Sequence, residues 1–158
     1  MAGYPYLIVD VFTREALAGN QLAVFTEGQA IPQERLQPLA LEMGFSETVF
    51  VFPPAGHETA RVRIFTPATE IPFAGHPVLG TAVALAIAGE LDRVDLVTPQ
   101  GNVPLEIADR TASCAFGRMH QPIPTVAPLP DAHALFAALR VTGSELPVEI
   151  YDDGLPHV

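Results

Sequence analysis

The sequence predicts a mixed α/β (α+β) fold in which a sheet wraps around one apolar helix. Apolar residues make up 49% of the 158 residues and charged residues only 16%, so there is enough apolar surface to build a core. Short segments rich in β-branched and aromatic residues recur along the first three quarters of the chain. Among them lies an uncharged helical segment, about 77–88, which we expect to be buried on all sides.

Local sequence features predict one helix and four strands before the uncharged helix. A helix is expected after Ile31, because Pro32 suits the first helical position and apolar residues then recur at helical spacing. Gly44 is expected to end that helix, since glycine readily takes the left-handed conformation found just beyond a helix. Strand-forming composition predicts strands at 6–12, 22–25, 45–52 and 61–65.

The elements beyond the uncharged helix are shorter. Pro77 suits the first turn of that helix and Gly89 marks its end. A Pro-rich stretch then has the composition of a linker, and Asp131 is expected to cap a helix that runs to about Arg140. Strands are predicted at 94–98, 103–108 and 112–116, with another that begins near Pro147.

Charge and composition exclude several classes of partner. The chain has 18 acidic and 8 basic residues, a net charge of −10, and all eight basic residues are scattered arginines. Without a basic patch we expect no nucleic-acid partner. Without lysine there is no Schiff-base nucleophile, and the single cysteine, Cys114, cannot form a disulfide within the chain. No apolar run is long enough to span a membrane and no signal peptide is evident, so we expect a cytoplasmic protein with no membrane partner.

The familiar cofactor motifs are all incomplete. His57-Glu58 begins like a zinc-protease helix, but Arg61 stands where a second histidine is required. Residues 74–80 have too few glycines for a dinucleotide-binding loop. We therefore expect no metal and no organic cofactor.

Glu47 is the first candidate for chemistry. It stands near the start of the predicted strand 45–52, and side chains two residues apart in a strand lie on one face. Its carboxylate is thus expected to share an apolar surface with Phe45 and Val49. Burial raises the pKa of a carboxyl group toward the range in which it both accepts and returns a proton near neutral pH. The alternative is a solvated carboxylate at the entrance of the strand.

Gly75 and His76, at the start of the uncharged helix, are the second candidates. Unpaired backbone N–H groups and the positive end of the helix dipole attract anions at such a position. Glycine lets a ligand approach the backbone closely, and the imidazole adds a donor to a carboxylate or enolate. The alternative is a histidine that only caps its own helix.

Five segments stand in the order seen in the PhzF-like family of phenazine-biosynthesis isomerases, which the chain resembles. The resemblance runs from about Tyr4 to Phe116 and resumes weakly at 153–157. The segments are Asp10–Thr13, Gly19-Asn20, Gly44–Phe50, Arg63–Pro67 and Glu70–Ala82. The last of these is long and specific, so the order of the five does not arise by chance.

The resemblance implies a fold, a site and a reaction. The fold is that of diaminopimelate epimerase, with a curled mixed sheet around a central helix. Glu47 stands where the family has its proton-shuttling glutamate, and Gly75 and His76 stand at substrate-binding positions. The implied reaction is a cofactor-free isomerisation, like that of a trans-2,3-dihydro-3-hydroxyanthranilate isomerase, which moves a proton within a small unsaturated cyclic carboxylic acid. Ala74 occupies the position of a thiol base in the epimerases, which disfavours two-base racemisation.

The family also implies a second lobe of similar size. We therefore expect an N-terminal epimerase-like lobe at 1–120, a Pro-rich linker and helix at 121–146, and the opening strand of a missing second lobe at 147–158. That lobe would come from another chain or from a homodimer, or it was lost by cleavage or an incomplete reading frame. Two alternatives stay open: a non-catalytic, self-associating module derived from an isomerase half, and a protein that stores or senses a small aromatic acid.

Overall fold

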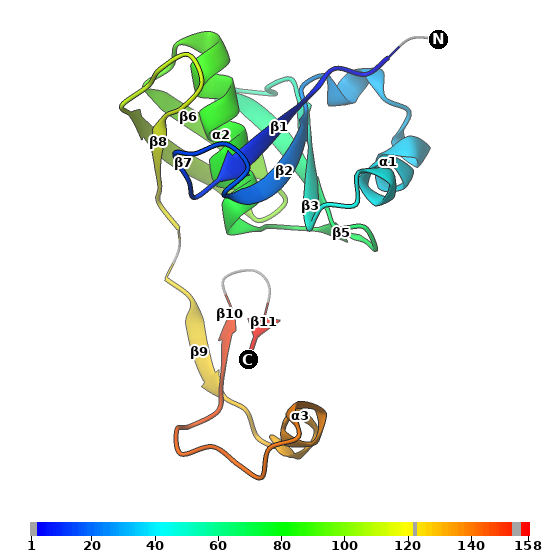
Figure 1. Cartoon of the computed structure of the whole chain (residues 1–158), viewed down its shortest axis with the longest axis vertical. Helices are drawn as coiled ribbons and strands as arrows, with labels where there is room; N and C mark the ends of the chain where they lie inside the picture. Colours follow the sequence, from blue (N-terminus) through cyan, green and yellow to red (C-terminus); the bar gives the residue numbers. More distant parts are fainter. Residues whose placement is uncertain (1–2, 122, 153–155) are drawn as a thin grey trace. The chain divides into compact units, whose positions relative to one another are not determined.

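A computed structural model describes residues 3–121, 123–152 and 156–158 of the chain (Figure 1). The chain divides into two compact units, Met1–His120 and Gln121–Val158. Within the described part of the chain, no helix combines the length and apolar character needed to cross a membrane.

One mixed sheet forms the framework of the first unit. Its strands follow the order β1-β2-β3-β4-β6-β7-β8, and the short β5 pairs with β4 at the side. The pairs β2–β3 and β4–β6 are parallel and the other pairs are antiparallel. The strands are β1 (Tyr6–Val11), β2 (Asn20–Phe25), β3 (Glu47–Phe52), β4 (Ala60–Phe65), β5 (Glu70–Ile71), β6 (Arg93–Thr98), β7 (Gly101–Ala108) and β8 (Phe116–Met119).

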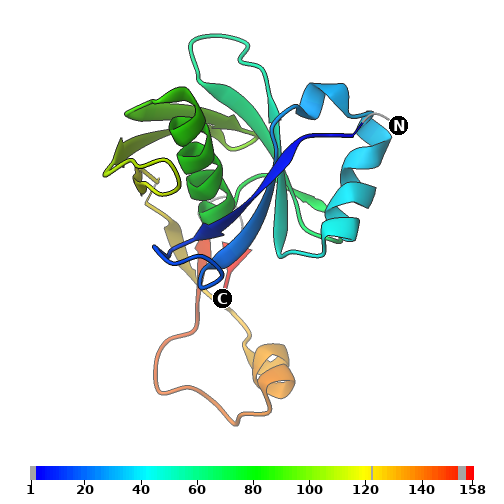
Figure 2. The ribbon, with the colours of Figure 1, turned by 45° about the horizontal axis from the view of Figure 1, so that its top comes forward.

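The sheet curls around α2 (Gly75–Gly89): in Figure 2 the green helix lies between the blue strands β1 and β2 and the green strands β6 and β7. The uncharged helix predicted at 77–88 is thus confirmed, and apolar side chains from β1 to β7 pack against it. It is not buried on all sides as expected, because Leu79 and Val83 are half-buried along one side, where they line a cavity, and Ala88 is exposed. Gly80 lets α2 approach the sheet closely: a Cβ atom there would lie 2.6 Å from Val11 Cγ2 and 2.9 Å from Leu22 Cδ2. The predicted α+β class, with a curled mixed sheet around a central helix, is confirmed.

The outer face of the sheet is covered by α1 (Leu36–Met43), which lies on the other side of β3 from α2 (Figure 1). Two short 3-10 helices, η1 (Gly28–Ala30) and η2 (Gln33–Arg35), lead into α1. Gly44 ends it with φ 68°, as predicted, and its N–H donates to the carbonyl of Ala40. The buried residues of this smaller core are Phe25, Ile31, Leu36, Ala40, Phe50 and Phe65.

The prediction of a strand at 112–116 is wrong, because β8 begins only at Phe116. Thr111 accounts for the difference. Its hydroxyl accepts hydrogen bonds from the N–H groups of Ser113 and Cys114 and donates one to the carbonyl of Cys114. These bonds hold 111–114 in a turn that competes with strand pairing.

The second unit contains three antiparallel strands and one short helix. β10 (Glu149–Asp152) pairs with β9 (Thr125–Pro128) on one side and β11 (Pro156–His157) on the other. β9 lies in the Pro-rich stretch for which the composition predicted only a linker. The helix α3 (His133–Leu139) begins close to its predicted start, and Asp131 Oδ1 accepts a hydrogen bond of 2.8 Å from the N–H of His133. Residues 153–155 of the weak family match lie outside the described residues.

Candidate active site

The start of β3 places Glu47 on the inner face of the sheet. Glu47 is the first residue of the strand and pairs in register with Leu22 of β2, whose side chain is fully buried against α2. Val49, two residues further, is also fully buried in the inner core. Phe45 precedes the strand, so the shared face predicted from alternation holds for Val49 only.

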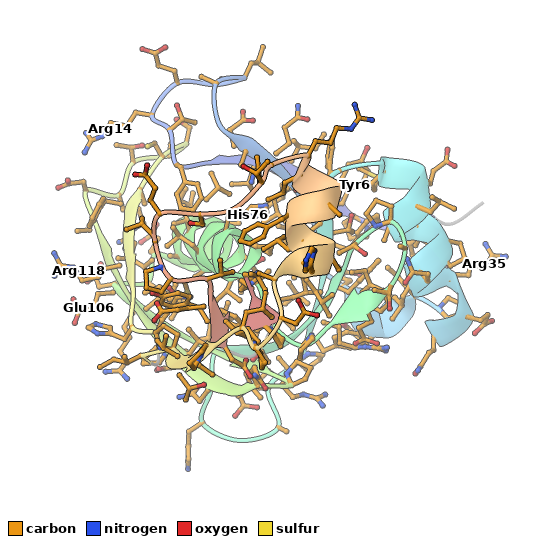
Figure 3. All side chains as sticks on the ribbon, turned by 90° about the horizontal axis from the view of Figure 1, so that it is seen from below. Tyr6, Arg14, Arg35, His76, Glu106 and Arg118 are labelled. Atoms are coloured by element: carbon orange, nitrogen blue, oxygen red, sulfur yellow. The ribbon has the colours of Figure 1, made fainter. Side chains whose placement is uncertain are left out.

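The first turn of α2 brings His76 to the same place. Figure 3 looks toward the end of α2 and shows His76 beside it. His76 Nε2 lies 3.4 Å from Glu47 Oε2, and only 11% of the His76 side chain and 17% of the Glu47 side chain are exposed. Both of these atoms are buried, and neither has a hydrogen-bond partner among the residues that the structure describes. The two predicted residues thus form a buried acid–imidazole pair.

Burial lowers the pKa of His76 below its ordinary value of 6.5, because a charged imidazolium is poorly solvated there. The negative charge of Glu47 and a hydrogen bond to the Gln21 backbone act in the opposite direction but are smaller effects. His76 is therefore predominantly neutral at pH 7. The surroundings that produce this shift are the apolar inner face of the sheet and the helix itself.

The two facing atoms of this pair have only each other as a polar neighbour in the described part of the chain. His76 Nε2 lies 3.4 Å from Glu47 Oε2, and neither atom has a hydrogen-bond partner there. When one of the two atoms carries a proton, the other has a lone pair that accepts the hydrogen bond. The pair is therefore suited to hold one movable proton.

The backbone at the start of α2 is open to an anion. Ala74 is the N-cap residue and forms no side-chain capping hydrogen bond, while its carbonyl accepts the N–H of Val78. Pro77 has no N–H, so the free donors of the first turn belong to Gly75 and His76. The ring of His76 contacts Glu47 and Gln21 rather than capping its own helix.

Phe12 is a third residue beside this pair, and no sequence signal had given it a role. Its ring centroid lies 6.4 Å from that of His76, with 55° between the ring planes. Phe12 is 74% exposed and its φ is 66°, in the left-handed region. Neither property is visible in the sequence, because Phe12 follows a strand of ordinary composition.

A cavity of about 770 Å³ adjoins the pair without including it. It lies between β1, α2 and β8, and Phe12 is the residue that it shares with the surroundings of His76. Glu47 and His76 do not line it. Within residues 3–121, 123–152 and 156–158, no three His, Cys, Asp or Glu side chains are grouped as metal ligands would be.

Comparison with known proteins decides the family. The family described as phenazine biosynthesis-like protein, PhzC-PhzF, matches residues 9–158 of the chain. The chain belongs to this family. The family resemblance carried by the five sequence segments is therefore confirmed.

Relatives within the phenazine biosynthesis-like family agree with the observed fold. A trans-2,3-dihydro-3-hydroxyanthranilate isomerase from Pseudomonas aeruginosa is 43% identical over 153 residues, which cover 97% of this chain and 55% of that protein. The solved structure of a predicted epimerase from Pseudomonas aeruginosa matches with a TM-score of 0.87 and 31% identity, over 98% of this chain and 57% of that one. This match confirms the epimerase-like fold. The chain spans about half the length of the relatives that it matches.

Proposed function

We propose that this chain supplies one half of the active site of a cofactor-free isomerase, which moves a proton within a small unsaturated cyclic carboxylic acid. The observation that carries the proposal is the buried pair of Glu47 and His76 beside the free N–H groups of α2. The trans-2,3-dihydro-3-hydroxyanthranilate isomerase that is 43% identical to this chain supports the choice of substrate class.

The helix start binds the negative charge of the substrate. The substrate carboxylate accepts hydrogen bonds from the N–H groups of Gly75 and His76, and the positive end of the α2 dipole stabilises its negative charge. When a proton leaves carbon, the electron pair of the broken C–H bond delocalises through the conjugated system toward this carboxylate. The same donors therefore stabilise the charge that develops during the reaction.

Glu47 carries the proton between two carbons. In the first step its carboxylate accepts the proton from the carbon beside the unsaturated system, and the C–H electrons shift into that system. In the second step the resulting carboxylic acid gives the proton to another carbon of the same system, so no atom or electron is gained or lost. Neutral His76 accepts a hydrogen bond from protonated Glu47 through Nε2, which holds the acid in place between the two steps.

The rest of the cleft is part of the same proposal. A second lobe closes the site opposite Glu47, and another polypeptide or a second copy of this chain can supply it. The match covers 55% of the isomerase relative, so the rest of that relative corresponds to residues outside the given sequence. We place the protein in the cytoplasm, in line with the expectation from its sequence.

Solvent-proton incorporation tests the reaction. Trans-2,3-dihydro-3-hydroxyanthranilate is incubated in deuterated buffer with the chain, alone and together with any polypeptide that co-purifies with it, and deuterium in the carbon skeleton is followed by NMR and mass spectrometry. Glu47→Gln should reduce the exchange rate by about 10²–10⁴-fold, the usual contribution of a positioned acid–base group. Glu42→Gln, an exposed carboxylate on α1, is the control and should leave the rate unchanged. Exchange that persists in Glu47→Gln would refute the assignment.

A second candidate is a non-catalytic binding or self-associating module. The observation that favours it is the edge strand β1, where the apolar side chains of Tyr6, Leu7 and Ile8 are 49%, 46% and 55% exposed. This candidate predicts that the chain binds an aromatic carboxylate without any deuterium incorporation, alone or with a co-purified polypeptide. Sedimentation of the purified chain distinguishes a monomer, a self-associated dimer and a complex with a second polypeptide.

A further inference from the structure

We propose that Phe12 is a specificity-determining residue: its exposed ring is the wall against which the flat face of an unsaturated ring substrate lies. The inference rests on the proposed function, because it concerns the substrate of the same site. Neither the sequence patterns nor the family resemblance assigned a role to Phe12. Phe12 stands immediately after β1, at the end of the strand that lies beside the start of α2.

The position of the ring fits this role. Its centroid lies 6.4 Å from that of His76, and the tilt of 55° shows that the two rings are not stacked. The imidazole therefore does not cover the face of the Phe12 ring, and 74% of the residue is exposed. An aromatic face is thus presented beside the buried acid–imidazole pair, within the reach of a six-membered ring whose carboxylate is held at the start of α2.

Packing within this chain does not explain the presence of an aromatic residue here. Phe12 has φ 66°, a conformation that side chains other than glycine rarely adopt and that bulky residues adopt least readily. A residue so exposed gains little from burial that would offset this strain. Strained residues of this kind cluster at ligand-binding sites, where the surrounding structure holds them in place.

The surrounding loop does hold Phe12 in place. Asp10 Oδ2 accepts a hydrogen bond of 2.8 Å from the N–H of Leu17, and the Thr13 hydroxyl bonds to the backbone of Glu15. Gly19 closes the base of the loop, where an added Cβ atom would lie 2.5 Å from the carbonyl oxygen of Val11. The backbone that carries the ring is therefore held before a ligand arrives, so less conformational entropy is lost on binding.

The chemistry of a flat ring selects this surface. A planar conjugated ring stacks on an aromatic face, and its binding is favoured both by the buried apolar area and by the electrostatic attraction between the two ring quadrupoles. Binding of a puckered saturated ring is favoured by the buried area alone. The helix start attracts the carboxylate and Phe12 contacts the ring, so the two features together recognise a planar cyclic acid. Phe12 would thus separate unsaturated from saturated cyclic carboxylates.

The test uses two probes on the full chain. The first is 3-hydroxyanthranilate, the fully aromatic counterpart of the compound in the relative's name, and the second is cyclohexanecarboxylate. Binding is measured by NMR titration of the His76 imidazole and the backbone amides of wild type, Phe12→Gly, Phe12→Tyr and Leu17→Ala. His76→Ala is followed by its backbone amides alone. Phe12→Gly removes the ring and suits the positive φ, so it should fold. Leu17→Ala is the matched control, because Leu17 is 89% exposed with φ 67° in the same loop.

We expect Phe12→Gly to weaken binding of 3-hydroxyanthranilate by about tenfold, as loss of one aromatic pair implies. Binding of cyclohexanecarboxylate should change by no more than about twofold, and Phe12→Tyr and Leu17→Ala should bind both probes like wild type. Equal affinity of wild type and Phe12→Gly for 3-hydroxyanthranilate, with binding lost in His76→Ala, would overturn the role of Phe12 alone. If wild type bound neither probe, the proposed function and the role of Phe12 would both be overturned.

Discussion

Glu47 Oε2 and His76 Nε2 lie 3.4 Å apart, each buried and each without a hydrogen-bond partner within the described part of the chain. One side chain comes from the first residue of β3 and the other from the first turn of α2, so the fold itself sets this distance. Because the Glu47 carboxylate acts directly on the His76 ring, removal of its charge must alter the titration of His76.

Removal of the Glu47 charge should lower the pKa of His76 further. Burial already holds this pKa below 6.5, and the negative charge of Glu47 is what raises it most. In Glu47→Gln the opposing effect is lost and the imidazole becomes harder to protonate. The measurement is an NMR titration of the His76 ring resonances in wild type and variant. Glu42→Gln should leave the titration unchanged, and a pKa that rises in Glu47→Gln would contradict the electrostatic account.

His76 should also make folding depend on pH. Its pKa in the folded state lies below the 6.5 of an unfolded chain, so the unfolded state binds more protons as the pH falls through this window. The free energy of unfolding should therefore be highest above about pH 6.5 and decrease as the pH falls toward the folded pKa. Urea unfolding of wild type and His76→Gln at several pH values measures this effect. The variant should lose less stability on acidification, and equal losses in both proteins would argue against it.

The sequence predicts the core of this fold better than the site. Composition alone indicates that α2 is buried, because none of its residues is charged and only a surrounding sheet can cover all its sides. Local hydrogen bonds escape such reasoning: residues 112–116 have a composition compatible with a strand, yet the Thr111 hydroxyl holds 111–114 in a turn.

The meeting of Glu47 and His76 could not be derived from spacing. It requires that β3 lies parallel to β2 and that α2 runs inside the curl of the sheet, and both are long-range properties of the topology. The family resemblance supplied this pairing, whereas composition supplied only two separate candidates. Phe12 escaped both approaches, since a positive φ at an aromatic residue leaves no trace in the sequence.

Gly80→Ala should destabilise the protein, although alanine normally favours a helix. The added Cβ atom would lie 2.6 Å from Val11 Cγ2 and 2.9 Å from Leu22 Cδ2, both in the packed inner core. Overpacking of this kind costs about 1–3 kcal/mol, which exceeds the 0.5–1 kcal/mol or so that alanine gains over glycine in a helix. Gly89→Ala at the end of the same helix is the control, since its Cβ would meet only the Leu91 side chain at 3.2 Å. Urea unfolding should show a clear loss for the first variant and little change for the second.

Arg63 should hold the segment that leads into α2. Its Nε and Nη2 donate to both carboxylate oxygens of Glu70 at 2.7 and 2.6 Å, and its guanidinium lies 5.2 Å from the centroid of the Phe65 ring. Because Glu70 opens β5, this contact ties β5 to β4 a few residues before Gly75. Lysine cannot form two parallel hydrogen bonds to one carboxylate.

Arg63→Lys should therefore lower the free energy of unfolding by about 0.5–1 kcal/mol, a range set by the partial exposure of the pair. Arg93→Lys is the matched control: Arg93 also bonds to both oxygens of one carboxylate, that of Asp95, but its side chain is 68% exposed and lies far along the chain from β5. It should leave the free energy of unfolding almost unchanged, because the pair is solvated. Hydrogen exchange adds a local readout, because only Arg63→Lys should speed exchange of the amides at 70–76. Equal effects of the two variants on this segment would show that the Arg63–Glu70 pair does not position the helix start.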